Sequence, residues 1–380
     1  MENFILYNPV KLHFGRGVVK DLGKVVSNYG KRVLLVYGGG SIKKNGIYDQ
    51  VLQQLAQAGA EVFEYSGIRP NPVIEDVDAA AALGRDKQVE VILAVGGGSV
   101  IDSAKIISIT IPVLHSGWDF VKGKVKPEKA VPLISVLTLA ATGTEMNRFA
   151  VVQDNKTKEK LGYGDPLTYP KESFLDPSYT LSVPVSYTSY GITDLVAHSL
   201  EAFFGEGEAS LSDRFVYAVI HEALENGPLL IKDPGNYLLR EKIMYAATNA
   251  LNNLTFYGRK SGDWGVHGIG HVLSVLYDVP HGASLSIAYP AWLRLHRDRI
   301  PDRIAELGVN LFQTVTADEA IDNLESWFRS IGSPVRLNEI GIDVKLTGEE
   351  IYCTLLANKT GGSHHRLSPQ DYRDLIRLMA

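Results

Sequence analysis

Cysteine is almost absent from this chain, whose 380 residues include only one, Cys353. A disulfide framework within the chain is therefore excluded, and such a composition is typical of a protein in a reducing compartment. The amino terminus, Met1-Glu2-Asn3-Phe4, has no basic region followed by an apolar core, so we expect no signal peptide. We expect a cytoplasmic protein, with Cys353 as a buried thiol on a helix.

Long hydrophobic runs and an excess of positive charge are missing as well. The most apolar stretch, residues 91–114, is interrupted by Ser99, Asp102 and Lys105, so it does not fit a helix that spans a bilayer. The formal net charge of −5 argues against nucleic acid or an anionic membrane as the main partner. A small molecule is the remaining default partner.

Two apolar runs, each followed by glycines, mark the first part of the chain. Residues 33–37 lead into Gly38-Gly39-Gly40-Ser41, and a helical pattern follows over residues 47–58. Residues 91–95 lead in the same way into Gly96-Gly97-Gly98-Ser99. Continuous apolar strands separated by helices are typical of a parallel sheet that helices cover on both faces.

Two domains are expected, because 380 residues exceed the size at which one hydrophobic core usually stops growing. Further strands are expected in the first part of the chain: one or two short ones over residues 4–15, and one each at residues 61–65 and 131–136. Farther along, the periodicity becomes helical, and we place the boundary near Pro184. The sequence therefore predicts a doubly wound, Rossmann-like α/β domain that binds a dinucleotide over residues 1–184, and an all-α domain over residues 185–380.

Each glycine run follows a strand and precedes a helix, where free backbone amides and the helix N-terminus favour a phosphate. A merely tight turn is the alternative for either run taken alone. We expect the second run to hold the pyrophosphate, with Asp102 either orienting the loop or meeting a ribose or nicotinamide group. The predicted cofactor-binding residues are Gly38, Gly39, Ser41, Gly97, Gly98, Ser99, Asp102, Thr138, Thr142, Thr144 and Lys160.

The first glycine run would lie near the adenosine of the dinucleotide. A free ribose diol is usually bound by a carboxylate at this place, and none is present. Gly39 leaves space, Ser41 can donate to a phosphate oxygen, and Lys43 and Lys44 raise the local potential. The sequence therefore favours NADP(H) over NAD(H), although a solvated helix start is the alternative for the two lysines.

Metal-ligand side chains occur in two pairs at helical spacing, Asp194 with His198 and His267 with His271, and His281 follows in a turn. Imidazole nitrogens with one carboxylate suit Zn or Fe(II), and three or four ligands leave an exchangeable position for a substrate oxygen. Unrelated polar residues on two packed helices are the alternative. We assign His271 a proton-relay role in preference to ligation, because histidine titrates near neutrality.

These motifs together resemble the iron-containing, or group III, alcohol dehydrogenases, and among them the butanol dehydrogenase branch. The resemblance runs essentially from end to end of the chain. Besides the glycine runs, Asp194 and the histidines at 198, 267, 271 and 281, it depends on Phe14-Gly15-Arg16-Gly17, Pro70-Asn71-Pro72, Asp102 with Ala104-Lys105, and Thr142-Gly143-Thr144-Glu145.

The resemblance implies a dehydroquinate synthase-like architecture, in which a cleft between the domains holds the nicotinamide and the metal. It further implies a homodimer, four metal ligands (Asp194, His198, His267 and His281), and His271 as an extra histidine of the metal-site motif. Because the same family includes glycerol dehydrogenases, which generally use Zn, the divalent metal is left as Fe(II) or Zn. Residues 361–366 depart from the Gly-Asn-Pro-like turn of many relatives, and their role is left open.

The predicted reaction is reversible hydride transfer between NAD(P)H and a short to medium aldehyde or primary alcohol, with aldehyde reduction as the expected cellular direction. The alternative enzyme is a metal-dependent hydrolase or lyase without net hydride transfer, which predicts no nicotinamide binding at the glycine turns. A nucleotide sensor or a metal-binding protein without catalysis is the third candidate. It is disfavoured because a sensor needs no open metal position beside a proton-relay histidine.

Overall fold

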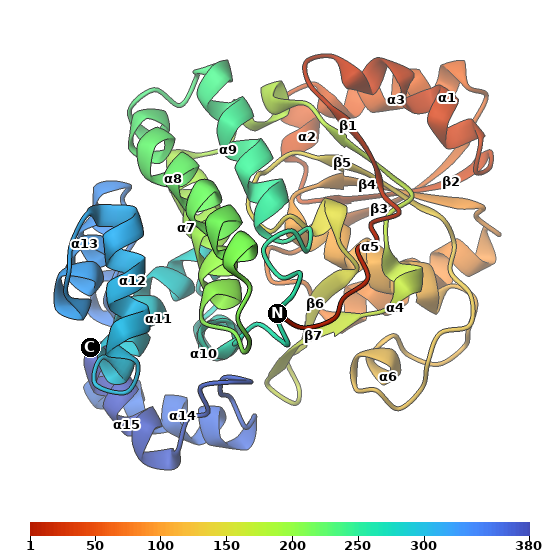
Figure 1. Cartoon of the computed structure of the whole chain (residues 1–380). Coiled ribbons are helices and arrows are strands. Elements are labelled where there is room, and N and C mark those ends of the chain that lie inside the picture. The colour runs from red at the N-terminus through yellow and green to blue at the C-terminus, as the bar shows by residue number, and fades with distance from the viewer. The chain divides into compact units, whose positions relative to one another are not determined.

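The computed structural model covers residues 1–380, and the chain divides into two compact units (Figure 1). The α/β unit comprises Tyr7–Val183 and Gly235–Met244. The helical unit comprises Met1–Leu6, Pro184–Pro234 and Tyr245–Ala380. The main division thus falls between Val183 and Pro184. Two short segments differ from the predicted ranges 1–184 and 185–380: Met1–Leu6 belongs to the helical unit, and Gly235–Met244 belongs to the α/β unit.

Six parallel strands form the central sheet of the α/β unit. They are β1 (Lys11–Phe14), β2 (Arg32–Gly38), β3 (Glu61–Ile68), β4 (Val91–Gly96), β5 (Leu133–Leu137) and β8 (Glu172–Leu175). Their order in the sheet is β1-β8-β5-β4-β2-β3, and every neighbouring pair is parallel. The carboxyl ends of all six strands therefore lie along the same edge of the sheet.

Helices cover both faces of this sheet (Figure 1). They are α1 (Leu22–Ser27), α2 (Ser41–Lys44), α3 (Ile47–Gln57), α4 (Ile74–Asp86), α5 (Gly98–Thr110) and α6 (Trp118–Val121). Alternate residues of β2 and β4 enter two separate cores: Leu34 and Ile92 lie in one with α4 and α5, whereas Leu35 and Leu93 lie in the other with α1 and α3. Burial on both faces is the reason why these strands read as continuous apolar runs.

Three strands are absent from the predicted set. Two of them, β6 (Phe149–Asp154) and β7 (Glu159–Gly164), form a separate antiparallel hairpin. The third, β8, lies between β1 and β5 and has the sequence Glu-Ser-Phe-Leu. Four residues with two polar side chains are too short for a periodic signal, so only pairing with its neighbours identifies this strand.

Of the one or two short strands expected over residues 4–15, the structure has one, Lys11–Phe14. The side chain of Asn8 accepts a hydrogen bond from the backbone N–H of Val10 at 3.1 Å and also donates to the carbonyl of Met146 at 2.8 Å. Asn8 thus makes a local turn, and Pro9 has no N–H to offer a strand ladder. Pairing begins only after this turn.

Glu172 of β8 ties the edge strand β1 to the sheet. Its carboxylate lies 2.6 Å from His13 Nε2 and 3.5 Å from Lys11 Nζ, and it accepts a hydrogen bond from the Tyr29 hydroxyl at 3.1 Å. Burial acts to raise the pKa of Glu172, but the hydrogen bonds from His13 and Tyr29 outweigh it and leave that pKa below its ordinary value. The ionised carboxylate is therefore the form that stabilises the fold.

Replacing Glu172 by glutamine is expected to lower the thermal stability more at pH 7 than at pH 3. A group whose folded pKa is depressed contributes stability above its unfolded pKa, and this contribution disappears as the pH falls through the folded pKa. Circular dichroism melts at the two pH values measure the difference. Glu61→Gln, which removes a solvent-exposed partner of Arg32, is the control and should change little. Equal losses for Glu172→Gln at both pH values would contradict the assignment.

The helical unit consists of α7 (Val185–Phe203), α8 (Ser210–Lys232), the end of α9 (Tyr237–Ala250) from Tyr245 onward, and the helices that follow. The latter are α10 (Gly265–Tyr277), α11 (His281–His296), α12 (Pro301–Phe312), α13 (Ala317–Ser330), α14 (Val344–Ala357) and α15 (Pro369–Leu378). Helix α7 is buried along most of its length and packs against α8, α10 and α11. Helices α10 and α11 also pack against each other, so the three helices that carry the predicted metal ligands are neighbours.

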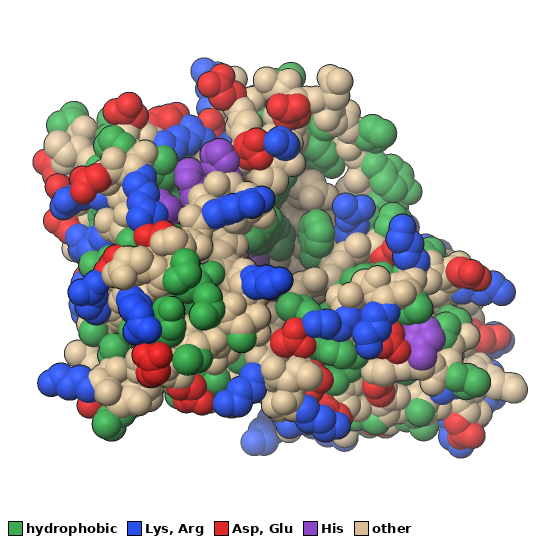
Figure 2. Space-filling view, turned by 90° about the horizontal axis from the view of Figure 1, so that it is seen from below, with side chains coloured by type: hydrophobic (Ala, Val, Ile, Leu, Met, Phe, Trp, Pro, Cys, Tyr) green, Lys and Arg blue, Asp and Glu red, His purple; other side chains and the backbone are tan.

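Cys353 is exposed on α14, so its predicted burial is wrong. The buried face of α14 is formed by Ile351 and Leu355, which are four residues apart, and Cys353 lies between them on the opposite side of the helix. None of the helices combines the length and the apolar character that crossing a membrane requires. On the face shown in Figure 2, lysine and arginine side chains are interspersed with aspartate and glutamate side chains, and neither sign forms a continuous band.

Candidate metal centre and cofactor site

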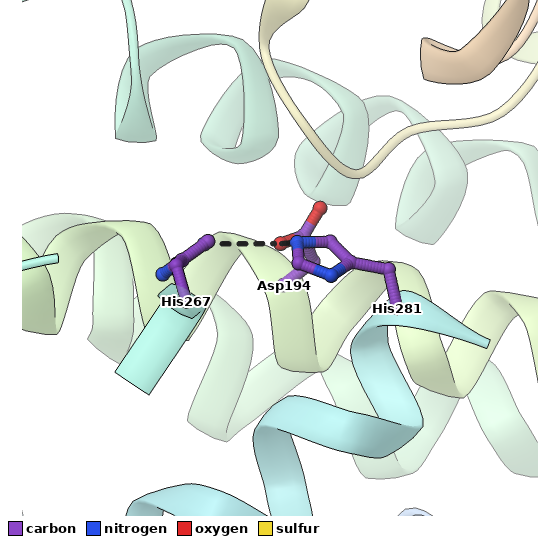
Figure 3. A group of neighbouring side chains, drawn as sticks. All are labelled: Asp194, His267 and His281. Atoms are coloured by element: carbon purple, nitrogen blue, oxygen red, sulfur yellow. Dashed lines mark ion pairs between the residues drawn. The ribbon is translucent and has the colours of Figure 1, made fainter. Parts of the chain in front are cut away.

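Three helices of the helical unit each contribute to one cluster of metal-binding side chains (Figure 3). Asp194 projects from α7, His267 from α10, and His281 is the first residue of α11 instead of part of a turn. One possible ligand atom from each of these residues lies within 4.8 Å of the others. The structure thus brings together three of the four predicted ligands from positions up to 87 residues apart.

The carboxylate of Asp194 lies at the centre of the cluster. Its Oδ1 atom is 3.4 Å from His198 Nδ1, 3.8 Å from His267 Nε2 and 3.7 Å from His281 Nε2. With bonds of about 2.1 Å to a tetrahedral metal ion, neighbouring ligand atoms lie about 3.4 Å apart. The observed separations are close to this value and longer than ordinary hydrogen bonds.

Three buried atoms of the cluster lack a hydrogen-bond partner: Asp194 Oδ1, His198 Nδ1 and His267 Nε2. Leaving such groups unsatisfied in the interior is costly, and native proteins rarely do so without a reason. Since these atoms face one another and all are ligand types for Zn or Fe(II), the residues present fit a divalent cation. His281 and its neighbour His271 are only partly buried, so the cluster is open to solvent on their side.

His198 departs partly from the predicted four-ligand arrangement. It lies beside Asp194, one turn along α7, but does not belong to the compact group of Asp194, His267 and His281. Burial lowers the pKa of His198 to about 4, so its imidazole is neutral at physiological pH. Neutral imidazole is the form that ligates metals.

His267 is held between two carboxylates, those of Asp194 and Glu201. Burial acts to lower the pKa of His267, but these two carboxylates outweigh it and raise the pKa to about 9. Nδ1 of His267 lies 2.7 Å from Glu201 Oε1, while Nε2 faces Asp194. A cation that bound through Nε2 would therefore displace a proton.

His271 lies one turn after His267 on α10, as the spacing predicts. The centroid of its ring is 5.5 Å from that of His281, and it is not a member of the compact three-residue group. This places a partly buried imidazole beside the cluster without making it a ligand.

Glu201 is the residue of the centre that the sequence analysis missed. Its carboxylate, on α7, is 1% exposed and binds His267. The signal was present in the spacing, because Glu201 follows His198 by three residues and Asp194 by seven, which places all three on one face of a helix. Glutamate is so common on helices that this spacing alone does not distinguish it from a surface residue.

The glycine turns lie at the carboxyl edge of the sheet in the α/β unit, after the adjacent strands β2 and β4. Gly40 has a φ of 102°, a left-handed conformation that favours glycine. A Cβ atom on Gly98 would lie 2.7 Å from the Thr142 side chain, so glycine permits the loop after β5 to approach the start of α5. A Cβ atom on Gly39 would meet nothing within 4 Å, so this position faces open space.

Other predicted cofactor residues are already engaged within the protein. The Ser99 hydroxyl donates to the Pro70 carbonyl, and Lys160 donates to Asn71 Oδ1 at 2.8 Å. The backbone N–H of Thr138 donates to the Gly96 carbonyl at 3.0 Å, which ties the ends of β4 and β5 together. Ser41, at the start of α2, is exposed.

Asp102 and Thr144 are buried and form part of one polar network. The Thr144 hydroxyl donates to Asp102 Oδ1 at 2.6 Å, and the other carboxylate oxygen accepts from the backbone N–H of Val151 at 2.8 Å. Lys105 Nζ donates to Thr144 Oγ1 at 2.6 Å, to Asn147 Oδ1 at 3.1 Å and to the Phe149 carbonyl at 2.6 Å. Asp102 was expected either to orient the loop or to meet a ribose or nicotinamide group, and this geometry favours the first of these roles.

Comparison with known proteins adds to this picture. A parallel sheet with glycine turns at its carboxyl edge, together with a histidine–aspartate centre on helices, suits a metal-dependent oxidoreductase that binds a dinucleotide. Residues 9–177 match the family model "Iron-containing alcohol dehydrogenase", and residues 188–367 match "Fe-containing alcohol dehydrogenase family, C-terminal". The chain belongs to the iron-containing alcohol dehydrogenase family.

Individual relatives agree with this family. The chain is 41% identical to a probable NADH-dependent butanol dehydrogenase 1 of Bacillus subtilis over 99% of both proteins. It is 34% identical to the NADPH-dependent aldehyde reductase YqhD of Escherichia coli over 90% of both. A crystal structure of NADH-dependent butanol dehydrogenase A from Thermotoga maritima superposes with a TM-score of 0.96 at 38% identity, over 100% of this chain and 99% of that one.

These comparisons confirm the predicted family, the fold class and the enzyme class, an alcohol dehydrogenase or aldehyde reductase that uses a metal and a nicotinamide cofactor. None of the relatives named above is a hydrolase or a lyase, so the alternative enzyme is not favoured.

Proposed function

We propose that the protein transfers a hydride reversibly between NAD(P)H and a short to medium aldehyde or primary alcohol. The observation that carries the proposal is the convergence of three histidine nitrogens on Asp194 Oδ1, together with the lack of hydrogen-bond partners at Asp194 Oδ1, His198 Nδ1 and His267 Nε2. Butanol dehydrogenase and aldehyde reductase are the activities named for the relatives, and both fit this substrate class.

We assign Asp194, His198, His267 and His281 to the metal, which is Fe(II) or Zn. A divalent ion held there supplies Lewis acidity toward the substrate oxygen, and the nicotinamide supplies the hydride. The protein's own residues hold the ligands rigidly: Asp194 and His198 are fixed on the buried helix α7, and His267 is fixed on α10 by Glu201. The solvent-open side, near His271 and His281, is where we expect the substrate oxygen.

His271 is proposed to exchange a proton with the substrate oxygen. Replacing His271 by alanine is expected to lower kcat by roughly 10²-fold, because a positioned general acid contributes at least that much, while metal and cofactor still bind. Steady-state kinetics, metal content and nucleotide titration on the same preparation measure the three quantities. His221→Ala removes a histidine that bonds only a backbone carbonyl of α12 and serves as the control. Unchanged turnover in His271→Ala would overturn the relay role.

The cofactor is proposed to be NADP(H) in preference to NAD(H), held by Gly38, Gly39, Ser41, Gly97, Gly98, Ser99, Thr138, Thr142, Thr144 and Lys160, with Asp102 orienting the loop. Support comes from the open space at Gly39, where a carboxylate would contact a ribose diol. The names of the relatives point both ways, since the B. subtilis protein is called NADH-dependent and the E. coli protein NADPH-dependent.

Gly39→Asp is expected to shift the preference toward NADH. The new carboxylate would accept hydrogen bonds from the 2′,3′-diol and repel a 2′-phosphate, so the ratio of kcat/KM for NADPH to that for NADH should fall about tenfold or more. Gly39→Asn, equal in size but uncharged, separates charge from bulk. A ratio that stays constant in Gly39→Asp would remove Gly39 from the specificity argument.

The decisive experiment is the oxidation of NADPH and of NADH with butanal by protein stripped of metal and reloaded separately with Fe(II) and Zn. Metal-dependent turnover supports the hydride mechanism, and the faster cofactor settles the preference. Turnover with NADH alone would overturn only the NADP(H) assignment. Absence of turnover with several aldehydes, despite bound metal, would overturn the proposed reaction.

A homodimer and a cytoplasmic location complete the proposal. The side chains of Phe4, Ile5, Leu6 and Tyr7 are exposed ahead of the edge strand β1, which supports an interface between two copies. The single cysteine supports a reducing compartment. Sedimentation equilibrium of the purified protein and fractionation of cells that produce it measure these two properties.

A further inference from the structure

We infer that Glu201 is a positioning residue for the metal centre, which sets the orientation of the His267 ring. The inference rests on the proposed metal site, because it assigns a role to a carboxylate that is outside the set of four ligands. Asp194 faces Nε2 of the His267 ring, and the Glu201 carboxylate binds Nδ1 on the other side of the same ring.

The contacts of Glu201 Oε1 are with a single residue. It lies 2.7 Å from His267 Nδ1 and accepts the backbone N–H of the same residue at 3.0 Å. An imidazole has two nitrogens, and a carboxylate at Nδ1 requires a proton there. The ring is therefore fixed with Nε2 directed toward Asp194, where a ligand atom is needed.

The second oxygen of Glu201 fixes the backbone that carries this ring. Oε2 accepts the N–H of Trp264 at 2.5 Å, and the Glu201 carbonyl accepts the N–H of Asp263 at 3.0 Å. Trp264 precedes α10 and has a φ of 63°, in the left-handed region. Glu201 thus holds both the start of α10 and the His267 ring, and a carboxylate is favourable at this end of a helix.

Asp263 offers a matched control, because it is a second buried carboxylate at the same helix start. It accepts the backbone N–H groups of Gly265 at 3.2 Å, His364 at 3.1 Å and His365 at 2.7 Å. All of these contacts are to backbone amides, so Asp263 supports the helix start without binding the ring of a ligand. Comparing the two carboxylates separates support of the fold from orientation of His267.

The experiment measures Co(II) and Zn affinity by competition with a chelating dye, using metal-free protein in four forms: wild type, Glu201→Gln, Asp263→Asn and Asp194→Ala. Glu201→Gln is expected to bind about 10- to 100-fold more weakly than wild type, because a carboxylate behind a metal-bound histidine is typically worth that much. The visible spectrum of the Co(II) protein should change as well. Asp263→Asn is expected to lower the melting temperature of the metal-free protein while leaving affinity and spectrum unchanged.

Two results would overturn the inference about Glu201 without contradicting the proposed metal site. One is wild-type affinity and spectrum in Glu201→Gln. The other is an equal loss of affinity in Asp263→Asn, which would reduce Glu201 to support of the helix start. If wild-type protein bound neither ion more tightly than Asp194→Ala, the proposed metal site and the inference would both be rejected.

Discussion

Replacing Asp194 by alanine is expected to lower the metal-dependent kcat/KM by roughly 10³-fold or more. Asp194 Oδ1 is the atom on which three histidine nitrogens converge, and no other carboxylate belongs to the compact cluster. Without it, the remaining ligands are imidazoles, which provide no negative charge to retain a divalent cation. Stabilisation of a developing alkoxide by several kcal/mol would be lost together with the ion.

The measurement combines kcat/KM for butanal with the metal content of the same preparation. Glu325→Gln is a suitable control in the helical unit, because the Glu325 carboxylate is largely buried but pairs with Arg294 and Arg336. This control is expected to retain the metal. Full metal content in Asp194→Ala, with turnover within tenfold of wild type, would rule out the assigned centre.

Replacing Lys105 by methionine is expected to destabilise the α/β unit by about 3–5 kcal/mol, since it leaves a buried carboxylate without its counter-charge. Lys105 is fully buried, and its ammonium group donates to three acceptors, one of which, the Thr144 hydroxyl, donates in turn to Asp102. Burial lowers the pKa of Lys105 to about 7, against the attraction of Asp102 and Glu145. For a unit of this size the loss corresponds to a fall of roughly 10 °C in Tm.

The loss in Lys105→Met is expected to depend on pH. Burial raises the pKa of Asp102, and the charge of Lys105 is the largest of the influences that lower it. The pKa of Asp102 therefore rises further in the variant, which lacks that charge. When an acidic group has a higher pKa in the folded state than in the unfolded state, the folded protein loses stability as the pH increases from the unfolded-state pKa to the folded-state pKa. The deficit of Lys105→Met should therefore be larger at pH 8 than at pH 5.

Thermal melts at the two pH values test this prediction. Ser108→Ala is the matched control on α5, because its buried hydroxyl donates only to the Lys105 carbonyl, and its loss should cost about 1 kcal/mol. A shift in Lys105→Met no larger than that of Ser108→Ala, or one equal at both pH values, would show that no uncompensated charge is created.

The sequence determined those parts of the fold in which local pattern and burial agree. β2 and β4 were predictable because each ends in glycines and is buried on both faces, as Leu34 in one core and Leu35 in the other show for β2. A helix containing His267 and His271 was predictable, because two residues four positions apart lie on the same face of a helix. The family followed from motifs of this local kind.

The tertiary structure decided which atoms meet. Pairing with β1 and β5 makes a strand of Glu172–Leu175, and three separate helices bring His267 and His281 to Asp194. Spacing along one helix does not report the partner of each imidazole nitrogen, so the contact between Glu201 and His267 Nδ1 was beyond the reach of sequence. The physical reason is that periodicity specifies the face of a helix, whereas distances of a few ångströms between side chains depend on how the helices pack.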